Sequence, residues 1–330
     1  MFKGKAKNHE NAPTQKKLSV YTLALDAAQG ETLRAICAAD SAFSPTETPY
    51  SNFSYKSKSR AVNIALYTSG KLVVSGKGTE DFVTNILEPQ VTGVARLGYD
   101  SVHNPEWFET HAGLDESGKG DLFGPVASAC VVAGAPAVEK WLAAGVRDSK
   151  TVGGDKKIFE LEKIIRETPG VVVKTAFVRI EKYNELYQKF GNLNAFLGHL
   201  HFLALKESLA EIIESGAAMP AWGLLDQFSK SPIVQRELSR NGIAFDLRMR
   251  TKAESDPVVA AASIVARATY VREIEKISEL AGMRIPKGCG APAKKTAAEI
   301  FKKFGRNRFG EFVKLHFKTA AEAAAESGAR

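Results

Sequence analysis

The stretch GLDESGKGDLFGP, residues 113–125, decides how the rest of the chain is interpreted, because it combines glycines with acidic side chains. Its first half has the G-x4-G-K spacing that opens a nucleotide-binding P-loop. A P-loop then requires a Ser or Thr hydroxyl for magnesium, whereas this chain has Gly120. Asp115 and Glu116 would also repel a bound triphosphate at close range. The stretch therefore predicts an acidic metal site with glycines beside it.

The charge of the chain is unevenly distributed. Its 330 residues are enough for two domains, and a hydrophobic content of 44% is enough for real cores. Residues 1–90 carry 11 basic and 8 acidic side chains, residues 91–280 carry 23 and 25, and residues 281–330 carry 11 and 4. Basic flanks around an acidic centre are expected of an enzyme that acts on a polyanion, although such charge can also serve solubility alone.

Three features predict a cytoplasmic protein without a membrane segment. The cysteines at 37, 130 and 289 are odd in number and form no C-x-x-C pair, as is typical of reduced thiols. The basic start MFKGKAKNHE is followed by no apolar segment of a secretory signal. The most apolar run, residues 125–138, is too short to cross a bilayer.

The first part of the chain is predicted to hold a disordered basic tail, residues 1–16, and a small β-α-β-β-β-α unit, residues 17–90. Strands are expected at 18–25, 51–55, 61–67 and 71–75, and helices at 31–39 and 79–86. Between them, YSNFSYKSKSR (50–60) alternates aromatic and basic side chains. This pattern fits a nucleic-acid-binding surface, and the aromatic side fits the core of the unit equally well.

A linker, residues 91–104, is expected to lead into a second domain, residues 105–330, that ends in a basic helical region. Strands are expected at 110–114, 126–133, 171–180, 222–226 and 244–248, and helices at 137–144, 156–167, 180–190, 194–214 and 257–280. Interleaved strands and helices predict an α/β domain with a central sheet. The working groups of such sheets lie at strand ends.

Four carboxylates are candidates for a metal site. Asp115 and Glu116 follow one apolar strand, and Asp226 ends another with no basic neighbour to neutralise it. Glu254 precedes a helix whose N-cap and first residue are expected at 256 and 257, so its side chain is free to point elsewhere. Four such acids could hold two hard cations about 3.5–4 Å apart for phosphodiester hydrolysis. Each acid taken alone fits a surface or capping role better than a metal-binding one.

Longer motifs make the pattern specific. DESGKGDLFGP (115–125), DSK (148–150), FGNLN (190–194), LLDQF (224–228), KAESDPVVAAASIVAR (252–267) and KLHFK (314–318) closely resemble, in order and spacing, the type 2 ribonucleases H. The resemblance covers residues 105–320 and is strongest to the ribonuclease HIII variant. Its sister ribonuclease HII typically has arginine at the position of Lys119 and aspartate at that of Glu254. LYTSGKLVVSGKGTEDF (66–82) is similar to the hairpin of a TATA-box-binding-protein-like domain, which ribonuclease HIII has and ribonuclease HII lacks.

The resemblance implies a fold and an activity. The fold is an RNase H-like α/β domain with a central mixed sheet, preceded by a small α+β TATA-box-binding-protein-like domain. The activity is hydrolysis of the RNA strand of RNA/DNA hybrids to 3′-hydroxyl and 5′-phosphate ends, in DNA replication and repair. Mg²⁺ or Mn²⁺ is the implied cofactor, with two ions when substrate is bound. We expect a monomer that binds the hybrid with both domains.

The resemblance also implies roles for individual residues. The catalytic, metal-binding acids are matched by Asp115, Glu116, Asp226 and Glu254. The loop that reads the ribose 2′-hydroxyl is matched by Gly118, Lys119 and Gly120. Contacts to the hybrid are implied for Ser149, Lys150, Asn192 and Asn194. Loop and helix capping are the alternatives for these last four residues.

Two other functions stay open at this stage. One is ribonuclease HII-like cleavage at single ribonucleotides in DNA, against which Lys119, Glu254 and the N-terminal unit argue. The other is a hybrid-binding protein without catalysis, which the presence of all four acids disfavours.

Overall fold

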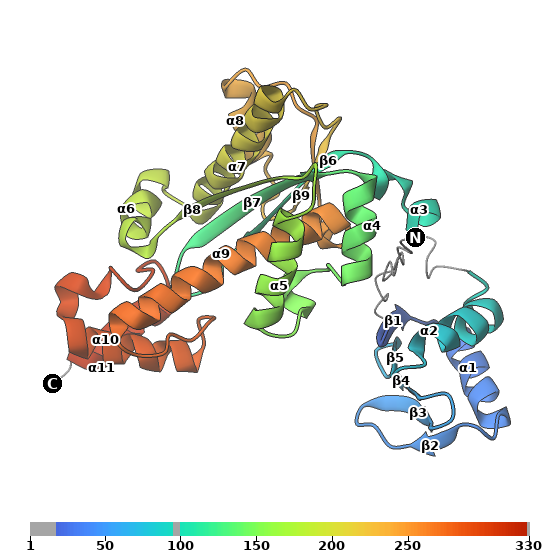
Figure 1. Cartoon of the computed structure of the whole chain (residues 1–330). Coiled ribbons are helices and arrows are strands. Elements are labelled where there is room, and N and C mark those ends of the chain that lie inside the picture. Colours follow the sequence, from blue (N-terminus) through green and yellow to red (C-terminus); the bar gives the residue numbers. More distant parts are fainter. Residues whose placement is uncertain (1–17, 95–99, 329–330) are drawn as a thin grey trace, which may run out of the picture. The chain divides into compact units, whose positions relative to one another are not determined.

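A computed structural model describes residues 18–94 and 100–328, and the chain divides after Pro105 into two compact units. Each unit has a five-stranded sheet of its own (Figure 1). The expected basic tail, residues 1–16, lies outside the described residues. In the described ranges, no helix is both long enough and apolar enough to span a membrane.

The sheet of the first unit is antiparallel, with the order β1-β5-β4-β3-β2. Its strands are β1 (Val20–Ala24), β2 (Ser44–Thr46), β3 (Ser51–Ser57), β4 (Val62–Tyr67) and β5 (Lys71–Ser75). Its helices are α1 (Ala27–Ala39), α2 (Thr79–Phe82) and η1 (Val83–Thr92). Strand β2 was not expected, and the last helical segment continues beyond residue 86, to Thr92, into the start of the expected linker.

The aromatic side of β3 belongs to the core of this unit. Tyr55 pairs with the buried Ile64, and Phe53 packs against the same cluster. Lys56 is opposite Asn63, and both side chains are exposed on the other side of the sheet. Of the two interpretations of this stretch, the core interpretation is therefore confirmed for Phe53 and Tyr55, whereas Tyr50 is exposed.

The sheet of the second unit has the order β10-β9-β6-β7-β8. Its strands are β6 (His111–Ser117), β7 (Val126–Ala133), β8 (Val172–Val178), β9 (Gly223–Asp226) and β10 (Leu247–Arg250). β6, β9 and β10 run parallel, whereas β7 and β8 pair antiparallel. The predicted central mixed sheet is thus confirmed.

Two long helices cover the two faces of this sheet (Figure 1). Successive side chains of β7 point alternately towards the two helices. Cys130 and Val132 belong to the core cluster that includes α7 (Leu193–Ser215), whereas Ala129 and Val131 belong to the cluster that includes the first part of α9 (Pro257–Ala281). Helix α9 begins as expected, because the Asp256 side chain accepts hydrogen bonds from the N–H groups of residues 258 and 259.

Shorter elements surround the two faces. They are α3 (Asp100–His103), η2 (Pro105–Phe108), α4 (Ala135–Ala144), η3 (Ser149–Thr151), α5 (Asp155–Arg166), α6 (Ile180–Phe190), α8 (Ile233–Arg240), η4 (Ala253–Ser255), α10 (Ala291–Phe309) and α11 (Lys318–Gly328). Helix α8 was not expected, and β10 begins three residues later than predicted. The prediction that Asp115 and Glu116 follow a strand was wrong, because pairing with β7 continues β6 through Ser117.

Candidate active site

Asp115 and Glu116 are consecutive residues inside β6, so their side chains point to opposite faces of the sheet. Ala112 and Leu114 belong to the cluster with α7, which places Glu116 on that face and Asp115 on the α9 face. A hydrogen bond links Asp115 to Ser263 of α9. The two neighbouring acids are therefore held by different layers of the fold.

Asp226 adjoins Asp115 across the parallel strands. The register pairs Leu114 with Leu225, and each carboxylate comes one residue later. The Oδ1 atom of Asp226 accepts a hydrogen bond of 2.9 Å from the backbone N–H of Ala253, the residue before Glu254. The end of β9 is thereby attached to the η4 turn that carries the fourth acid.

A glycine allows β6 to approach the start of α9. A Cβ atom on Gly113 would lie 2.4 Å from the backbone of Val258 and Val259, closer than real contacts allow. Because Asp115 lies two residues further along β6, this approach sets the separation between its carboxylate and the segment that contains Glu254.

The acids form an electrostatically strained group. Burial and the neighbouring Glu116 carboxylate, with a smaller contribution from Asp226, raise the pKa of Asp115 well above its ordinary value. The Oε2 atom of Glu254 is buried, and no hydrogen-bond partner for it lies among the described residues. A hard cation would offset both costs, so these oxygen ligands fit Mg²⁺ or Mn²⁺.

The glycine loop follows directly after β6. Gly118 has φ +87°, and a Cβ atom there would lie 2.1 Å from the carbonyl oxygen of Pro125. Lys314, which is fully buried, donates from Nζ to the carbonyl oxygens of Gly118, Asp121 and Pro125. The loop is thus fixed from behind by a residue of the C-terminal region.

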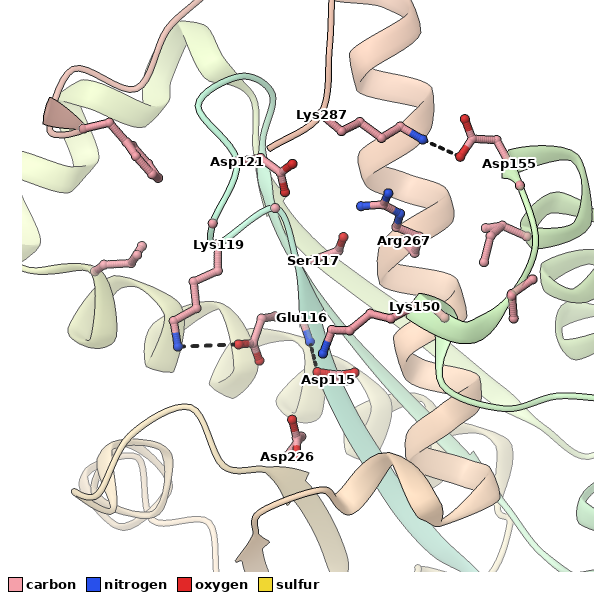
Figure 2. A pocket seen from close by; sticks show the side chains of 18 of the residues that line it. Asp115, Glu116, Ser117, Lys119, Asp121, Lys150, Asp155, Asp226, Arg267 and Lys287 are labelled. Atoms are coloured by element: carbon pink, nitrogen blue, oxygen red, sulfur yellow. Dashed lines mark hydrogen bonds and ion pairs between the residues drawn. The ribbon is translucent and has the colours of Figure 1, made fainter. Parts of the chain in front are cut away.

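Lys119 does not extend freely into solvent. Its Nζ atom donates to the carbonyl oxygen of Phe228 at 3.3 Å and lies 3.8 Å from Oε1 of Glu116. Figure 2 shows this lysine reaching down from the loop towards Glu116. Lys119, which belongs to the loop expected to recognise the ribose, is therefore in contact with Glu116, one of the expected metal ligands.

The DSK motif approaches the acids from the other side. The Ser149 hydroxyl lies 2.7 Å from the hydroxyl of Ser263, which also contacts Asp115. Burial alone would lower the pKa of Lys150, but the carboxylates of Asp148, Asp115, Glu254 and Asp226 together raise it. The Lys150 ammonium therefore lies close enough to Asp115, Asp226 and Glu254 to interact with them electrostatically (Figure 2).

These groups line a groove of about 1060 Å³. Its lining includes three of the acids, the glycine loop, two of the three residues of the DSK motif and further cations: Asp115, Glu116, Gly118, Lys119, Gly120, Ser149, Lys150, Asp226, Arg267 and Lys287. Glu254 is not among the residues that line the groove, but it directly follows Ala253, whose backbone N–H donates to Asp226. Among the described residues, no three His, Cys, Asp or Glu side chains form a ready-made metal cluster. Mg²⁺ characteristically binds one or two carboxylates and completes its shell with water and substrate phosphates.

The structure places the two expected asparagines outside the groove. The Asn192 side chain accepts from the N–H of Ala195 and caps α7, which begins one residue earlier than expected, so the capping alternative is confirmed for Asn192. Asn194 is exposed in the first turn, and Leu193 between them lines the groove. A contact of either asparagine with the hybrid stays a prediction.

Sequence reasoning missed several residues of the site. Ser263 and Arg267 are four residues apart on α9 and thus share one face of the helix, a signal that the apolar surroundings concealed. Lys314 lies in the KLHFK motif, but its contact with the glycine loop, like that of His201 with Ser128, joins residues far apart in the sequence, and no spacing indicated either contact.

Comparisons with known proteins agree with this geometry. A family model described as "Ribonuclease HII" matches residues 112–320. Ribonuclease HIII of Protochlamydia amoebophila is 36% identical over 277 residues, covering 84% of this chain and 88% of the relative. Ribonuclease HIII of Chlamydia pneumoniae is 38% identical over 279 residues, covering 82% and 88%. The crystal structure of Bst-RNase HIII in complex with Mn²⁺ superimposes with a TM-score of 0.63 at 29% identity, covering 94% of this chain and all of that one.

Proposed function

Because this chain belongs to the ribonuclease HIII branch of the type 2 ribonuclease H family, we propose that it hydrolyses the RNA strand of RNA/DNA hybrids. It is an endonuclease that leaves 3′-hydroxyl and 5′-phosphate ends. The observation that carries the proposal is the groove in which Asp115, Glu116 and Asp226 meet the glycine loop and the cations Lys150 and Arg267.

Asp115, Glu116, Asp226 and Glu254 are the residues that would hold Mg²⁺ or Mn²⁺, with two ions when substrate is bound. Such ions supply an activated water and stabilise the leaving oxygen in phosphodiester hydrolysis. The raised pKa of Asp115 and the unpartnered oxygen of Glu254 support this assignment, since a bound cation would offset the cost of both.

The remaining groove residues bind the hybrid. The backbone of Gly118, Lys119 and Gly120 approaches the ribose, because a Cβ on Gly120 would meet no atom within 4 Å and the groove is open there. Lys150, Arg267 and Lys287 bring positive charge to the phosphates. Ser149 holds the DSK turn against α9.

The N-terminal unit, residues 17–90, contributes further contacts to the hybrid. Its exposed sheet face carries Lys56, whereas the aromatic residues of β3 are committed to the core. The basic side chain on this face makes electrostatic contacts with the phosphates. The enzyme acts as a cytoplasmic monomer.

A cleavage assay on two labelled duplexes tests the proposal. Purified protein with Mg²⁺ or Mn²⁺ is expected to cut a full RNA/DNA hybrid and to leave intact a DNA duplex that contains one ribonucleotide. Cutting of both duplexes would indicate ribonuclease HII-like activity. Cutting of neither would indicate binding without catalysis.

A further inference from the structure

Glu116 is contacted by a buried histidine that the proposed reaction does not use. Nε2 of His201 lies 3.2 Å from Oε2 of Glu116, and Nδ1 lies 2.6 Å from the hydroxyl of Ser128. His201 and Ser128 are both fully buried. The register of β6 and β7 pairs Glu116 directly with Ser128, so both side chains point towards α7, where His201 bridges them.

The chemistry of these contacts fixes the direction of each hydrogen bond. An ionised carboxylate only accepts, so Nε2 of a neutral His201 carries the hydrogen and donates to Glu116. Nδ1 is then an acceptor, and the Ser128 hydroxyl donates to it. Ser128 thus selects the tautomer that can hold Glu116.

The other oxygen of Glu116 is connected to the same histidine by a second route. Oε1 lies 3.8 Å from Nζ of Lys119, which donates to the carbonyl oxygen of Phe228. The Phe228 ring stacks on the His201 ring, with centroids 5.1 Å apart and planes at 22°. Glu116, His201, Phe228 and Lys119 therefore form a closed ring of contacts between the acid and the glycine loop.

We propose that Ser128 and His201 are positioning residues that orient the Glu116 carboxylate for metal binding and couple it, through Phe228 and Lys119, to the Gly118–Gly120 loop. The proposal rests on the proposed function only in that Glu116 binds the metal. Hydrogen bonds to a ligating carboxylate set its orientation, and their loss typically weakens metal binding or activity about 10- to 100-fold.

Variants of the full-length protein separate the hydrogen bond from the shape of the side chain. His201→Leu removes both ring nitrogens, whereas the amide of His201→Gln can still donate from the position of Nε2. Ser128→Ala leaves the imidazole in place but removes the hydrogen bond that selects its tautomer. The matched controls are His199→Leu, two residues away on α7 and bonded to Glu237, and Ser208→Ala, whose hydroxyl bonds within the helix to Ala204.

The first measurement is binding of Mn²⁺ alone, followed by the electron paramagnetic resonance signal of the free ion. His201→Leu is expected to weaken this binding about 10- to 100-fold, Ser128→Ala by less, and His201→Gln by about threefold or less. The controls are expected to bind like the wild type. On the hybrid at a fixed metal concentration, kcat is expected to fall in the same order while KM stays constant.

Two results would overturn the proposal. One is wild-type Mn²⁺ affinity in folded His201→Leu, or in Ser128→Ala and His201→Gln together if the leucine variant does not fold. The other is an equal loss in the Gln and Leu variants, which would indicate a role in packing alone. Glu116→Gln distinguishes a failure of the proposed site, because unchanged Mn²⁺ binding in that variant would remove Glu116 from the metal ligands.

Discussion

The carboxylate of Asp226 accepts a hydrogen bond from the backbone N–H of Ala253, 27 residues later in the chain. This bond holds the end of β9 against the turn that carries Glu254, and thereby links the segments of two proposed metal ligands.

Asp226→Asn keeps an acceptor for the Ala253 N–H and removes only the negative charge. We expect it to lower kcat at least about 100-fold, because a weakened metal site loses several kcal/mol of transition-state stabilisation. Affinity for the hybrid is expected to change little in an equilibrium binding measurement. Asp246→Asn, an exposed carboxylate paired with Arg248, serves as the control, and wild-type turnover of the Asp226 variant would exclude this residue from the site.

Lys150→Met should change metal and substrate binding in opposite directions. The Lys150 ammonium is stabilised by Asp115, Glu254 and Asp226, so it competes with a cation for the same negative charge. Without it, Mn²⁺ alone should bind a few-fold more tightly, while KM for the hybrid should rise because a phosphate contact is lost. Weaker Mn²⁺ binding in this variant would contradict the assigned position of the lysine.

Gly113→Ala should destabilise the second unit by about 1–3 kcal/mol or more, since the added methyl would lie 2.4 Å from the backbone of α9, which cannot yield as a side chain could. Urea denaturation measures the change in the free energy of unfolding. Gly153→Ala is the matched control, because a Cβ there meets no atom within 4 Å, and its effect should stay within about 0.5 kcal/mol. Equal stability of the two variants would mean that β6 and α9 are further apart than described.

Lys314 should make stability depend on pH. Burial lowers the pKa of this amine from 10.5 to about 7, opposed in part by Asp121. Between these two values the unfolded chain binds more protons than the folded protein, so the free energy of unfolding rises with pH, by up to about 1.4 kcal/mol per unit. Below pH 7 both states are protonated and the contribution is constant.

The comparison with Lys314→Met isolates this contribution, because all other titrating groups are shared. From pH 7 to pH 9, the free energy of unfolding measured by chemical denaturation should increase more for the wild type than for the variant. A constant difference over this range would show that the buried amine remains protonated.

Lys56→Glu should weaken binding of the hybrid, because a cation near the phosphates is replaced by an anion. The slope of log affinity against log salt concentration should become shallower by about one to two units. Arg34→Glu on α1 makes the same charge change away from the exposed sheet face, and its effect on the salt slope should be smaller. Equal effects of the two variants would argue against that face as the contact surface.

The sequence predicted those elements whose signals are local. Helix α9 has its cap at Asp256 and a proline directly after it, and the apolar strand β7 is bounded by clear turns. The strand that carries Asp115 and Glu116 was predicted too short, because polar residues are kept in β6 only by pairing with β7. Strand β2 likewise exists through its partner β3.

The site follows the same division. The acids and the glycine loop each lie within a short contiguous motif, so they could be proposed from the sequence. The network of His201 joins residues 116, 128 and 201 from three elements, and no spacing in the sequence connects them. Such contacts are products of tertiary packing.

The bond between Lys314 and the carbonyl group of Gly118 spans 196 positions of the chain. During synthesis from the N-terminus, the acids and the glycine loop emerge long before the lysine that fixes the loop from behind. The groove can therefore reach its final form only after the segment that contains Lys314 has been made. A product that ends between residues 254 and 314 would carry every proposed metal ligand and still lack the lysine that fixes the loop.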